Sequence, residues 1–369
     1  MKLKLIPLLI LIVFNSFGQD ADTWVAYNDK EGYLFGYKNL KGQTMTPPRF
    51  MGFSAARKFD KIAVLMEDNN GKFDSYYMLK DGTKFGRDSL YVSDMTFDCE
   101  SEGLIKFRDP KTDKVGMFNE FGKVAIPAEY NDITRFKNGL AIGLKNARRA
   151  YWDKEENHSD CNHWSWVEGK EVLINKNNEI LVDGFPLNEN IDFYSLIISD
   201  KPAEDSIRAN FLGTDKKYYS FIDNQKLFNT FLQTKLLNDL SLDNLMQHSY
   251  SDIVYWSENT GWNTKPKEKF LKDNAHILKE RLSLIRKKGT KYFISIDDFT
   301  PMPDEMEAQF DAVRDNCGNW NSSKYPIYNT VVTHNDLKGK FLFQDHFTFL
   351  KINDRIQFIS CSIKNAHIK

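Results

Sequence analysis

The sequence predicts a β-rich domain of repeated antiparallel hairpin units, followed by an α+β domain. Three observations support this order. Glycines that close similar turns fall at positions 42, 82 and 122, a constant spacing of 40 residues. Aromatic residues are abundant, with 28 Phe, 16 Tyr and 7 Trp, and they favour strands. After residue 220 the apolar residues change from strand-like alternation to helical spacing.

The best-preserved repeat unit is residues 116–142, GMFNEFGKVAIPAEYNDITRFKNGLAI. Its turn closes at Gly122, and weaker copies close at Gly42 and Gly82. A fourth copy follows an insertion of 16 residues and carries Asn178 at the turn, where asparagine tolerates the left-handed conformation. Each copy predicts short antiparallel strands that share a core with their neighbours.

Apolar residues alternate with a period of two in two of the predicted strands. This period predicts strands with one buried face. The alternating residues are Ile62, Val64 and Met66 in one strand, and Leu140, Ile142 and Leu144 in the other.

The third unit resembles the bacterial WG repeat. The matching residues are Gly116, Asn119, Gly122, Lys123, Ile126, Pro127, Tyr130, Phe136, Gly139, Leu140 and Ala141. The tryptophan of the pattern is replaced by Val115 here, and by Phe35 and Ser75 in the first two units. The resemblance covers residues 25–200 and implies a β-rich scaffold, common in exported or envelope proteins and without a shared catalytic residue set.

The insertion before the fourth unit, residues 151–166, is the predicted binding site. Trp152, Trp164 and Trp166 are its candidate contact residues, because tryptophan contributes much of the binding energy at interfaces. The alternative is that these rings cover the end of the β-array. His158, Cys161 and His163 are of metal-ligand type, but no partner pair with standard spacing exists elsewhere. We therefore predict no metal and no cofactor.

The N-terminus has the pattern of a secretory signal peptide in residues 1–19. Lys2 and Lys4 precede an apolar run over residues 5–14, and small or polar residues lead to a processing site near Gln19. The alternative is an uncleaved anchor, although the run is short for a membrane span. We expect a secreted or periplasmic protein with a repeat domain over 20–200 and a second domain over 201–369. A polar linker is predicted at residues 199–205.

Removal of Lys2 and Lys4 leaves 48 basic residues against 51 acidic residues, a net charge of −3. This charge argues against a nucleic-acid partner, which needs a concentrated basic surface. The four cysteines, in an oxidising compartment, permit one or two disulfides, with three possible connectivities if all four pair. The pairs Cys99–Cys161 and Cys317–Cys361 would each stay within one half of the chain. Alternatively, Cys361 is a free buried thiol.

The second half predicts helices over residues 225–240, 241–248 and 265–288, with Ser241 and Thr264 as N-caps. Strands are expected at 253–256, 291–296, 325–333, 340–352 and 355–363. The last two should form a hairpin across Asn353-Asp354. Its apolar alternation is carried by Phe341, Phe343, Phe347 and Phe349.

This order of elements resembles the cone-shaped NTF2-like fold, although no diagnostic motif matches. Some members of that fold class are enzymes with an Asp–His or Tyr–Asp pair. The residues of those types are Asp252, Tyr255, His276, Asp297, His334 and His346. No phosphate loop, nucleophile elbow or zinc-helix motif is present, so no catalytic residue is assigned. The leading hypothesis is an exported, non-catalytic protein that binds a protein or cell-envelope component. The alternative is a small-molecule-binding or enzymatic second domain.

Overall fold

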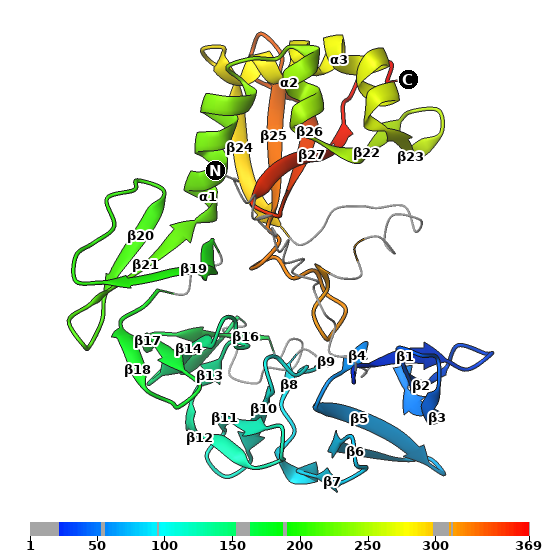
Figure 1. Ribbon diagram of the computed structural model, residues 1–369, viewed down its shortest axis with the longest axis vertical. Helices are drawn as coiled ribbons and strands as arrows, with labels where there is room; N and C mark the ends of the chain where they lie inside the picture. Colours follow the sequence, from blue (N-terminus) through cyan, green and yellow to red (C-terminus); the bar gives the residue numbers. More distant parts are fainter. Residues whose placement is uncertain are drawn as a thin grey trace, which may run out of the picture.

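The computed structural model describes residues 22–368 except for 53–55, 94–95, 153–162, 187–189, 298–309 and 311–312. Strands dominate the first two thirds of the chain, and three helices and a large sheet form the last third (Figure 1). The predicted signal peptide and the apex of the predicted insertion lie outside the described residues.

Four units of three antiparallel strands make up the first part, and each begins one strand earlier than the predicted repeat, whose best copy at residues 116–142 runs from the second strand of the third unit to the first strand of the fourth. The first unit is β1 (Trp24–Asn28), β2 (Leu34–Asn39) and β3 (Thr44–Met51). The others are β5 (Ile62–Asn69), β6 (Lys72–Leu79) and β7 (Lys84–Phe85), then β10 (Leu104–Asp109), β11 (Lys114–Asn119) and β12 (Val124–Tyr130), then β14 (Leu140–Lys145), β17 (Lys170–Asn175) and β18 (Ile180–Asp183). Short segments between them are β4 (Lys58–Phe59), η2 (Arg87–Ser89), β8 (Val92–Ser93), β9 (Thr96–Phe97) and β13 (Asp132–Ile133).

The repeated turn joins the second and third strands of each unit. Gly42, Gly82 and Gly122 have φ angles of 81°, 87° and 70°, in the left-handed region that glycine adopts without strain. Asn178 occupies the fourth turn with φ 63°, which confirms its predicted substitution for glycine. In the third turn, the Asn119 carboxamide accepts hydrogen bonds from the backbone N–H groups two and four residues later, at 3.0 Å each.

Both faces of β5 are buried, so the prediction of one buried face was wrong for this strand. Ile62 and Val64 pack into a cluster shared with β10 and β11, while Ala63 and Leu65 pack against the first unit. All four side chains are at most 2% exposed. Both faces of β14 are buried as well. Leu140 and Ile142 pack into one cluster, and Ala141 between them packs into a different cluster on the other face. β5 is also paired with β3, so the first two units belong to one seven-stranded sheet in the order β4-β1-β2-β3-β5-β6-β7. β5 and β14 each contribute side chains to two cores, one on either face.

A three-stranded sheet follows, made of β19 (Ile191–Ser199), β20 (Arg208–Leu212) and β21 (Tyr218–Asp223) in the order β19-β21-β20. The segment predicted as a linker, residues 199–205, connects β19 to β20 within this sheet. Helix α1 begins directly after β21, with the Asp223 carboxylate accepting from the backbone N–H groups of Gln225 and Lys226.

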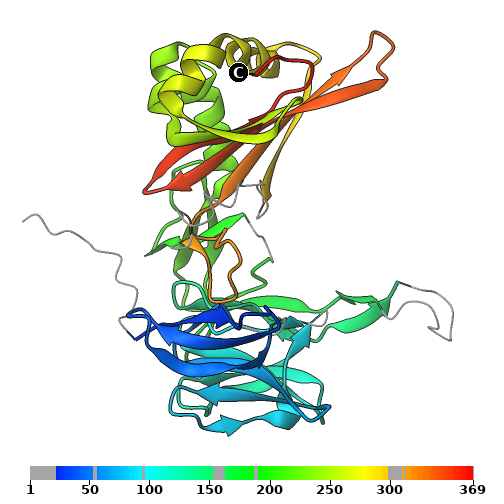
Figure 2. The ribbon, with the colours of Figure 1, turned by 90° about the vertical axis from the view of Figure 1, so that its right-hand side faces the viewer.

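The last part consists of helices on one face of a six-stranded sheet (Figure 2). The helical elements are α1 (Asn224–Phe231), the π-helical η3 (Leu232–Leu236), α2 (Leu242–Gln247), α3 (Lys267–Ser283) and η4 (Leu284–Arg286). The strands are β22 (Ser249–Ser257), β23 (Gly261–Pro266), β24 (Lys291–Asp297), β25 (Ile327–Asn335), β26 (Phe341–Ile352) and β27 (Arg355–Ser362), in the order β23-β22-β27-β26-β25-β24.

Of the two helix caps and one hairpin turn predicted in this part, the structure confirms one cap and the turn. Ser241 caps α2, and its hydroxyl accepts from the Asn244 backbone N–H. Thr264 does not cap α3, because it belongs to β23 and the cap position is Pro266. Asn353 and Asp354 both have positive φ, 49° and 57°, as a two-residue hairpin turn requires.

The apolar alternation of the last hairpin is buried over only part of its length. Phe347 and Phe349 are at most 1% exposed beneath the helices, whereas Phe341 is 57% exposed. The hairpin of β25 and β26 extends beyond the helices at the far end (Figure 2). The core between helices and sheet is filled by side chains that include Phe228, Leu232, Phe270, Leu278 and Tyr328.

Candidate functional site

The predicted binding tryptophans lie on a two-stranded hairpin, β15 (Arg148–Tyr151) and β16 (Trp164–Val167). This hairpin projects sideways from the repeat part, farther than any strand beside it in Figure 2. Residues 153–162, which include His158 and Cys161, lie outside the described part of the chain. His163 is described and exposed.

Trp164 and Trp166 form one packed group with Arg149. The two rings meet edge to face with centroids 4.7 Å apart. The Arg149 guanidinium lies 4.3 Å from the Trp164 ring centroid and 5.5 Å from that of Trp166, which are cation–π distances. Arg149 also forms an ion pair with Asp113 at 2.5 Å. Both rings are therefore partly covered by the hairpin's own side chains, which fits the alternative in which they serve packing.

Trp152 lies on the opposite face of the hairpin, so the three tryptophans do not form one surface. Its side chain is 66% exposed, and its ring stacks on His163 with centroids 5.4 Å apart. The Trp152 indole N–H donates to the Ser165 hydroxyl at 2.7 Å, which fixes the ring orientation. Among the three predicted residues, Trp152 presents most apolar surface to a partner.

A disulfide joins the two parts of the chain, between Cys99 and Cys317. This bond is neither of the two pairs that would keep each disulfide within one half of the chain. Sequence proximity suggested bonds within each half, but the loop between β24 and β25 returns to the repeat part and places Cys317 beside Cys99. Cys361 is the free buried thiol of the alternative prediction, and burial raises its pKa.

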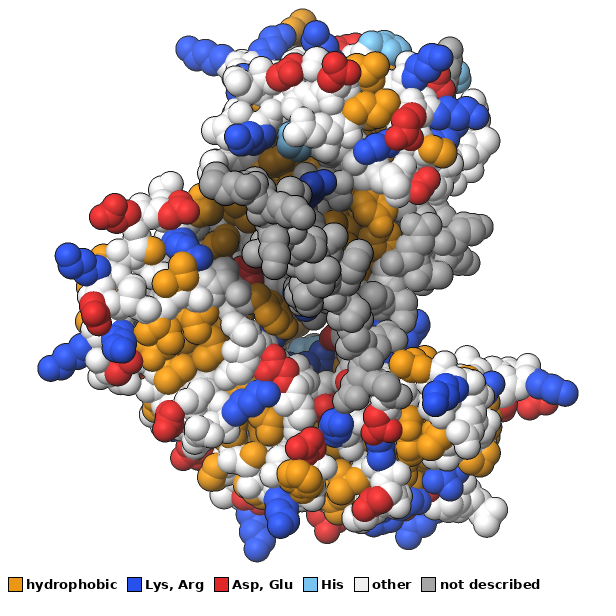
Figure 3. Space-filling view, viewed as in Figure 1, with side chains coloured by type: hydrophobic (Ala, Val, Ile, Leu, Met, Phe, Trp, Pro, Cys, Tyr) orange, Lys and Arg blue, Asp and Glu red, His pale blue; other side chains and the backbone are white. Residues whose placement is uncertain are grey.

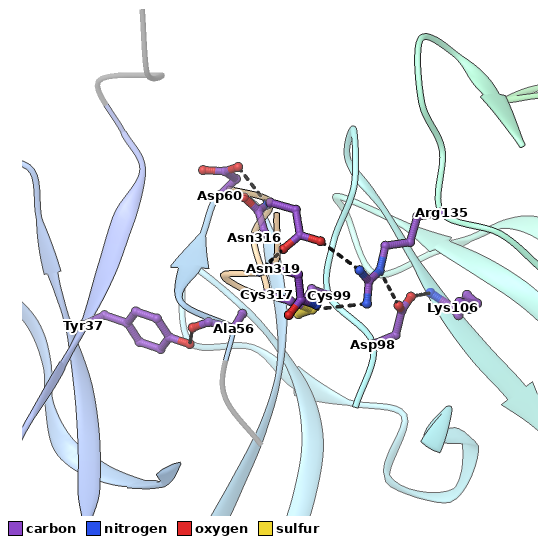
Figure 4. The surroundings of a disulfide bond; sticks show 11 residues. Tyr37, Ala56, Asp60, Asp98, Cys99, Lys106, Arg135, Asn316, Cys317 and Asn319 are labelled. Carbon is purple, nitrogen blue, oxygen red and sulfur yellow. Dashed lines mark hydrogen bonds and ion pairs between the residues drawn. A yellow bond between two sulfur atoms is a disulfide. The ribbon is translucent and has the colours of Figure 1, made fainter. Parts of the chain in front are cut away.

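Arg135 lies at the centre of this junction (Figure 4). Its guanidinium forms ion pairs with Asp98 at 2.8 Å and with Asp315 at 3.0 Å, and donates to Cys317 Sγ at 3.2 Å. Burial raises the pKa of Asp315, and the positive charge of Arg135 partly opposes this shift. One cation from the repeat part thus pairs with a carboxylate from each side.

Further hydrogen bonds connect the same two segments. The Asn316 carboxamide donates to Asp60 at 2.9 Å (Figure 4), and the Asn316 carbonyl accepts from the Lys58 backbone N–H at 3.0 Å. Lys137 donates to the Ser323 hydroxyl. A cavity of about 830 Å³ lies against these contacts, between the repeat part and residues 314–323.

The five candidate residues of the second domain whose side chains are described do not converge on one site. Tyr255 is 6% exposed in the core, His276 is exposed on α3, and the side chain of Asp297 is not described. Asp252 accepts a hydrogen bond from its neighbour Ser251.

His334 has a carboxylate partner that sequence reasoning missed, since its Nε2 lies 2.7 Å from Asp345 Oδ2. Asp345 is fully buried, and Arg281 approaches it at 3.6 Å. His346 points away from this pair on the same strand, because adjacent strand residues alternate in direction. Asp345 falls on the same face of β26 as the buried Phe347 and Phe349, so the apolar alternation along this strand marked it as a buried carboxylate that needs a partner.

The residues described contain no group of three or more His, Cys, Asp or Glu side chains placed to hold a metal ion. None of the helices described is long and apolar enough to cross a membrane. Lys, Arg, Asp and Glu side chains are interspersed over the face shown in Figure 3.

Comparison with known proteins gives one family match. No curated protein matches the chain. A solved domain from Xanthomonas campestris, whose name assigns it to the calcium/calmodulin dependent protein kinase II association domains, shares 13% identity. The match covers 38% of this chain and 85% of that one, and its TM-score of 0.18 carries no conclusion. Residues 116–146 match the family described as "WG containing repeat". This match shows a WG-containing repeat over residues 116–146, a stretch that runs from β11 to β14.

Proposed function

We propose that this protein is exported and acts by binding a protein or cell-envelope component, without catalysis. The N-terminal pattern of a signal peptide supports export. The Cys99–Cys317 disulfide supports it independently, because such bonds persist in oxidising compartments and are rare in the cytosol.

Trp152 is the residue that we propose contacts the partner. It is 66% exposed on a hairpin that projects from the scaffold, and its indole is held in one orientation by Ser165. A large ring that is already ordered loses little conformational entropy on binding, so less of the free energy gained by burying it is offset. The partner would bury this ring, while the Trp164–Arg149–Trp166 group maintains the hairpin.

The test is capture of envelope components from the source cells by immobilised mature protein, residues 20–369. Trp152→Ala should abolish capture of a specific component. Phe121→Ala is the matched control, because Phe121 is also exposed, at 67%, on a repeat turn away from the hairpin. Equal capture by wild-type and Trp152→Ala protein would refute the role of the hairpin.

A second candidate function concerns the C-terminal part, for which we propose an α+β domain of the NTF2-like cone type. A pocket of about 710 Å³ there favours small-molecule binding. Leu227 and Phe231 of α1 and Ile356 of β27 supply apolar walls, and His248 lines the same pocket. Burial, with a contribution from Lys235, lowers the pKa of His248, so this imidazole is neutral at pH 7.

Binding of the dye 1-anilinonaphthalene-8-sulfonate tests this pocket. Thr230→Trp would fill it, because Thr230 is one of its lining residues, and should remove most of the dye fluorescence. Thr290→Trp, at the turn after η4, is the control and should leave the signal unchanged. Equal dye fluorescence in wild-type and Thr230→Trp protein would contradict the assignment. A crystal structure of the full chain decides whether the sheet and helices form an NTF2-like cone.

A further inference from the structure

The cavity at the junction of the two parts has connected walls before any ligand is present. The Cys99–Cys317 disulfide and the Arg135–Asp315 ion pair link the wall formed by the repeat part to the wall formed by residues 314–323. Its volume of about 830 Å³ lies within the roughly 300–1,000 Å³ typical of small-molecule sites. A ligand would therefore enter a largely preformed space and would not need to order its walls.

The lining described for this cavity contains equal numbers of basic and acidic side chains. Its four cations face four carboxylates, so the cavity presents little net charge to a ligand. The cations are Lys106, Arg135, Lys137 and Arg314, and the carboxylates are Asp60, Glu100, Glu102 and Asp315. A phosphate or a polyanion would need an excess of cations, and this lining does not provide one.

The carboxylates already accept hydrogen bonds from the protein. Glu100 accepts from the backbone N–H groups of Lys61 at 2.7 Å, Ile62 at 3.0 Å and Gly103 at 3.1 Å. Asp60 accepts from the Thr23 hydroxyl at 2.6 Å as well as from Asn316. An ammonium group on a ligand would compete with these donors. A hydroxyl group can donate to a remaining lone pair and leave the existing bonds intact.

The lining also contains uncharged polar groups and two aromatic rings, the buried Trp320 and the more exposed Tyr194. Asn319, Asn321 and Ser322 contribute amides and a hydroxyl, which both donate and accept. Tyr194 from β19 lines the cavity and is 39% exposed overall, and the Lys324 ammonium lies 5.5 Å from its ring centroid, which leaves the other ring face for a ligand. A sugar ring presents C–H groups on one face and hydroxyls around its rim, which matches an aromatic ring surrounded by such groups.

We propose that this cavity binds a neutral, polyhydroxylated ligand, namely a short oligosaccharide. The site is separate from the hairpin, and it does not depend on Trp152. Tyr194 would stack on a sugar ring, and Asn319, Asn321 and Ser322 would bind its hydroxyls.

Isothermal titration calorimetry of the mature protein with maltotriose, cellotriose and triacetylchitotriose tests the proposal. We expect at least one trisaccharide to bind. Tyr194→Ala should weaken that binding roughly tenfold or more, since the ring would lose its buried contact. Tyr194→Phe should retain most of the affinity because the ring remains. Trp152→Ala should have no effect, which separates failure of this site from failure of the hairpin.

Two controls exclude indirect effects. Tyr33→Ala removes a ring that is 77% exposed on the first repeat unit, and it should leave binding unchanged. Thermal unfolding of Tyr194→Ala should match that of the wild type, and Ser322→Trp, which fills the cavity, should abolish binding. No heat with any of the three sugars up to 10 mM, unchanged affinity in Tyr194→Ala, or binding of glycine or inorganic phosphate in their place would overturn the proposal.

Discussion

At the scale of single residues, glycine in the second strand of a repeat explains part of the family pattern. A Cβ at Gly116 would lie 2.5 Å from the Ile126 carbonyl oxygen and 2.8 Å from the Phe107 ring. A Cβ at Gly36 would meet the Thr46 carbonyl oxygen at 2.4 Å. In both units the third strand passes too close for any side chain. These glycines are therefore required by sterics and not by backbone conformation.

Gly116→Ala should destabilise the protein by about 1–3 kcal/mol, the usual cost of overpacking, because the added methyl meets backbone that cannot move aside. Urea unfolding followed by tryptophan fluorescence measures this change. Gly52→Ala is the control, since its Cβ would have an ordinary contact of 3.6 Å. Equal loss in the two variants would show that the close approach at residue 116 is unimportant.

His248 makes stability depend on pH. Its pKa is lowered by burial and by Lys235, so the unfolded chain binds the proton more readily than the folded chain. The stability due to neutral His248 is present above the unfolded pKa, about 6.5, and is lost as pH falls through the lower folded value. His248→Gln should therefore lose less stability between pH 7.5 and 5 than the wild type. Urea titrations at both values, with exposed His276→Gln as the control, check the sign.

At the scale of elements, the sequence predicts the turns and helix caps that depend on a few adjacent residues. The turn at Asn178, the cap at Ser241 and the hairpin at Asn353-Asp354 depend on a few adjacent residues, and the structure confirms all three. Thr264 was assigned to a cap because its neighbours suit a helix start. Instead, Thr264 is part of β23, because the pairing of this strand with β22 extends through Pro266 and the helix starts only after it. The burial of both faces of β5 depends on neighbouring sheets, which the pattern of one strand does not contain.

The packing of Trp164 and Trp166 on Arg149 makes them supports of the hairpin. Trp164→Ala should increase hydrogen exchange and trypsin cleavage within residues 148–167, because the ring and the cation over it are both lost. The midpoint of global unfolding should change little, since the hairpin is a separate two-stranded sheet. Trp152→Ala should leave exchange unchanged. Faster exchange in Trp152→Ala than in Trp164→Ala would reverse the assigned roles.

At the scale of the whole molecule, the junction could not be predicted from the sequence. Cys99 and Cys317 are 218 residues apart, and the residues around them have no pattern that indicates a pair. The same holds for the candidate cavity, whose carboxylates and cations come from strand β10 and several loops of both parts. The insertion at residues 151–166 was singled out because its tryptophans are clustered in sequence, although its hairpin was not predicted. The cavity was missed because its residues are clustered only in space.

Removal of the disulfide should destabilise the protein by roughly 2–5 kcal/mol, since it closes a long loop in the unfolded chain. Cys99→Ser with Cys317→Ser should lower the unfolding midpoint, and dithiothreitol should lower that of the wild type to the same value. Cys361→Ala serves as the control for loss of a thiol, and it should keep the response to dithiothreitol. A double variant as stable as the wild type would show that the noncovalent contacts of Arg135 and Asn316 suffice.

The disulfide also changes how the two parts can move. The chain already passes from one to the other between β21 and α1, at Asp223 and Asn224. With Cys99 bonded to Cys317, the covalent structure becomes a closed ring with two crossing points. A body attached at one point can swing and rotate, whereas one attached at two separate points can only rock about the line between them. A single proteolytic cut near residue 224 would therefore leave one covalent molecule until a reductant opened the second crossing.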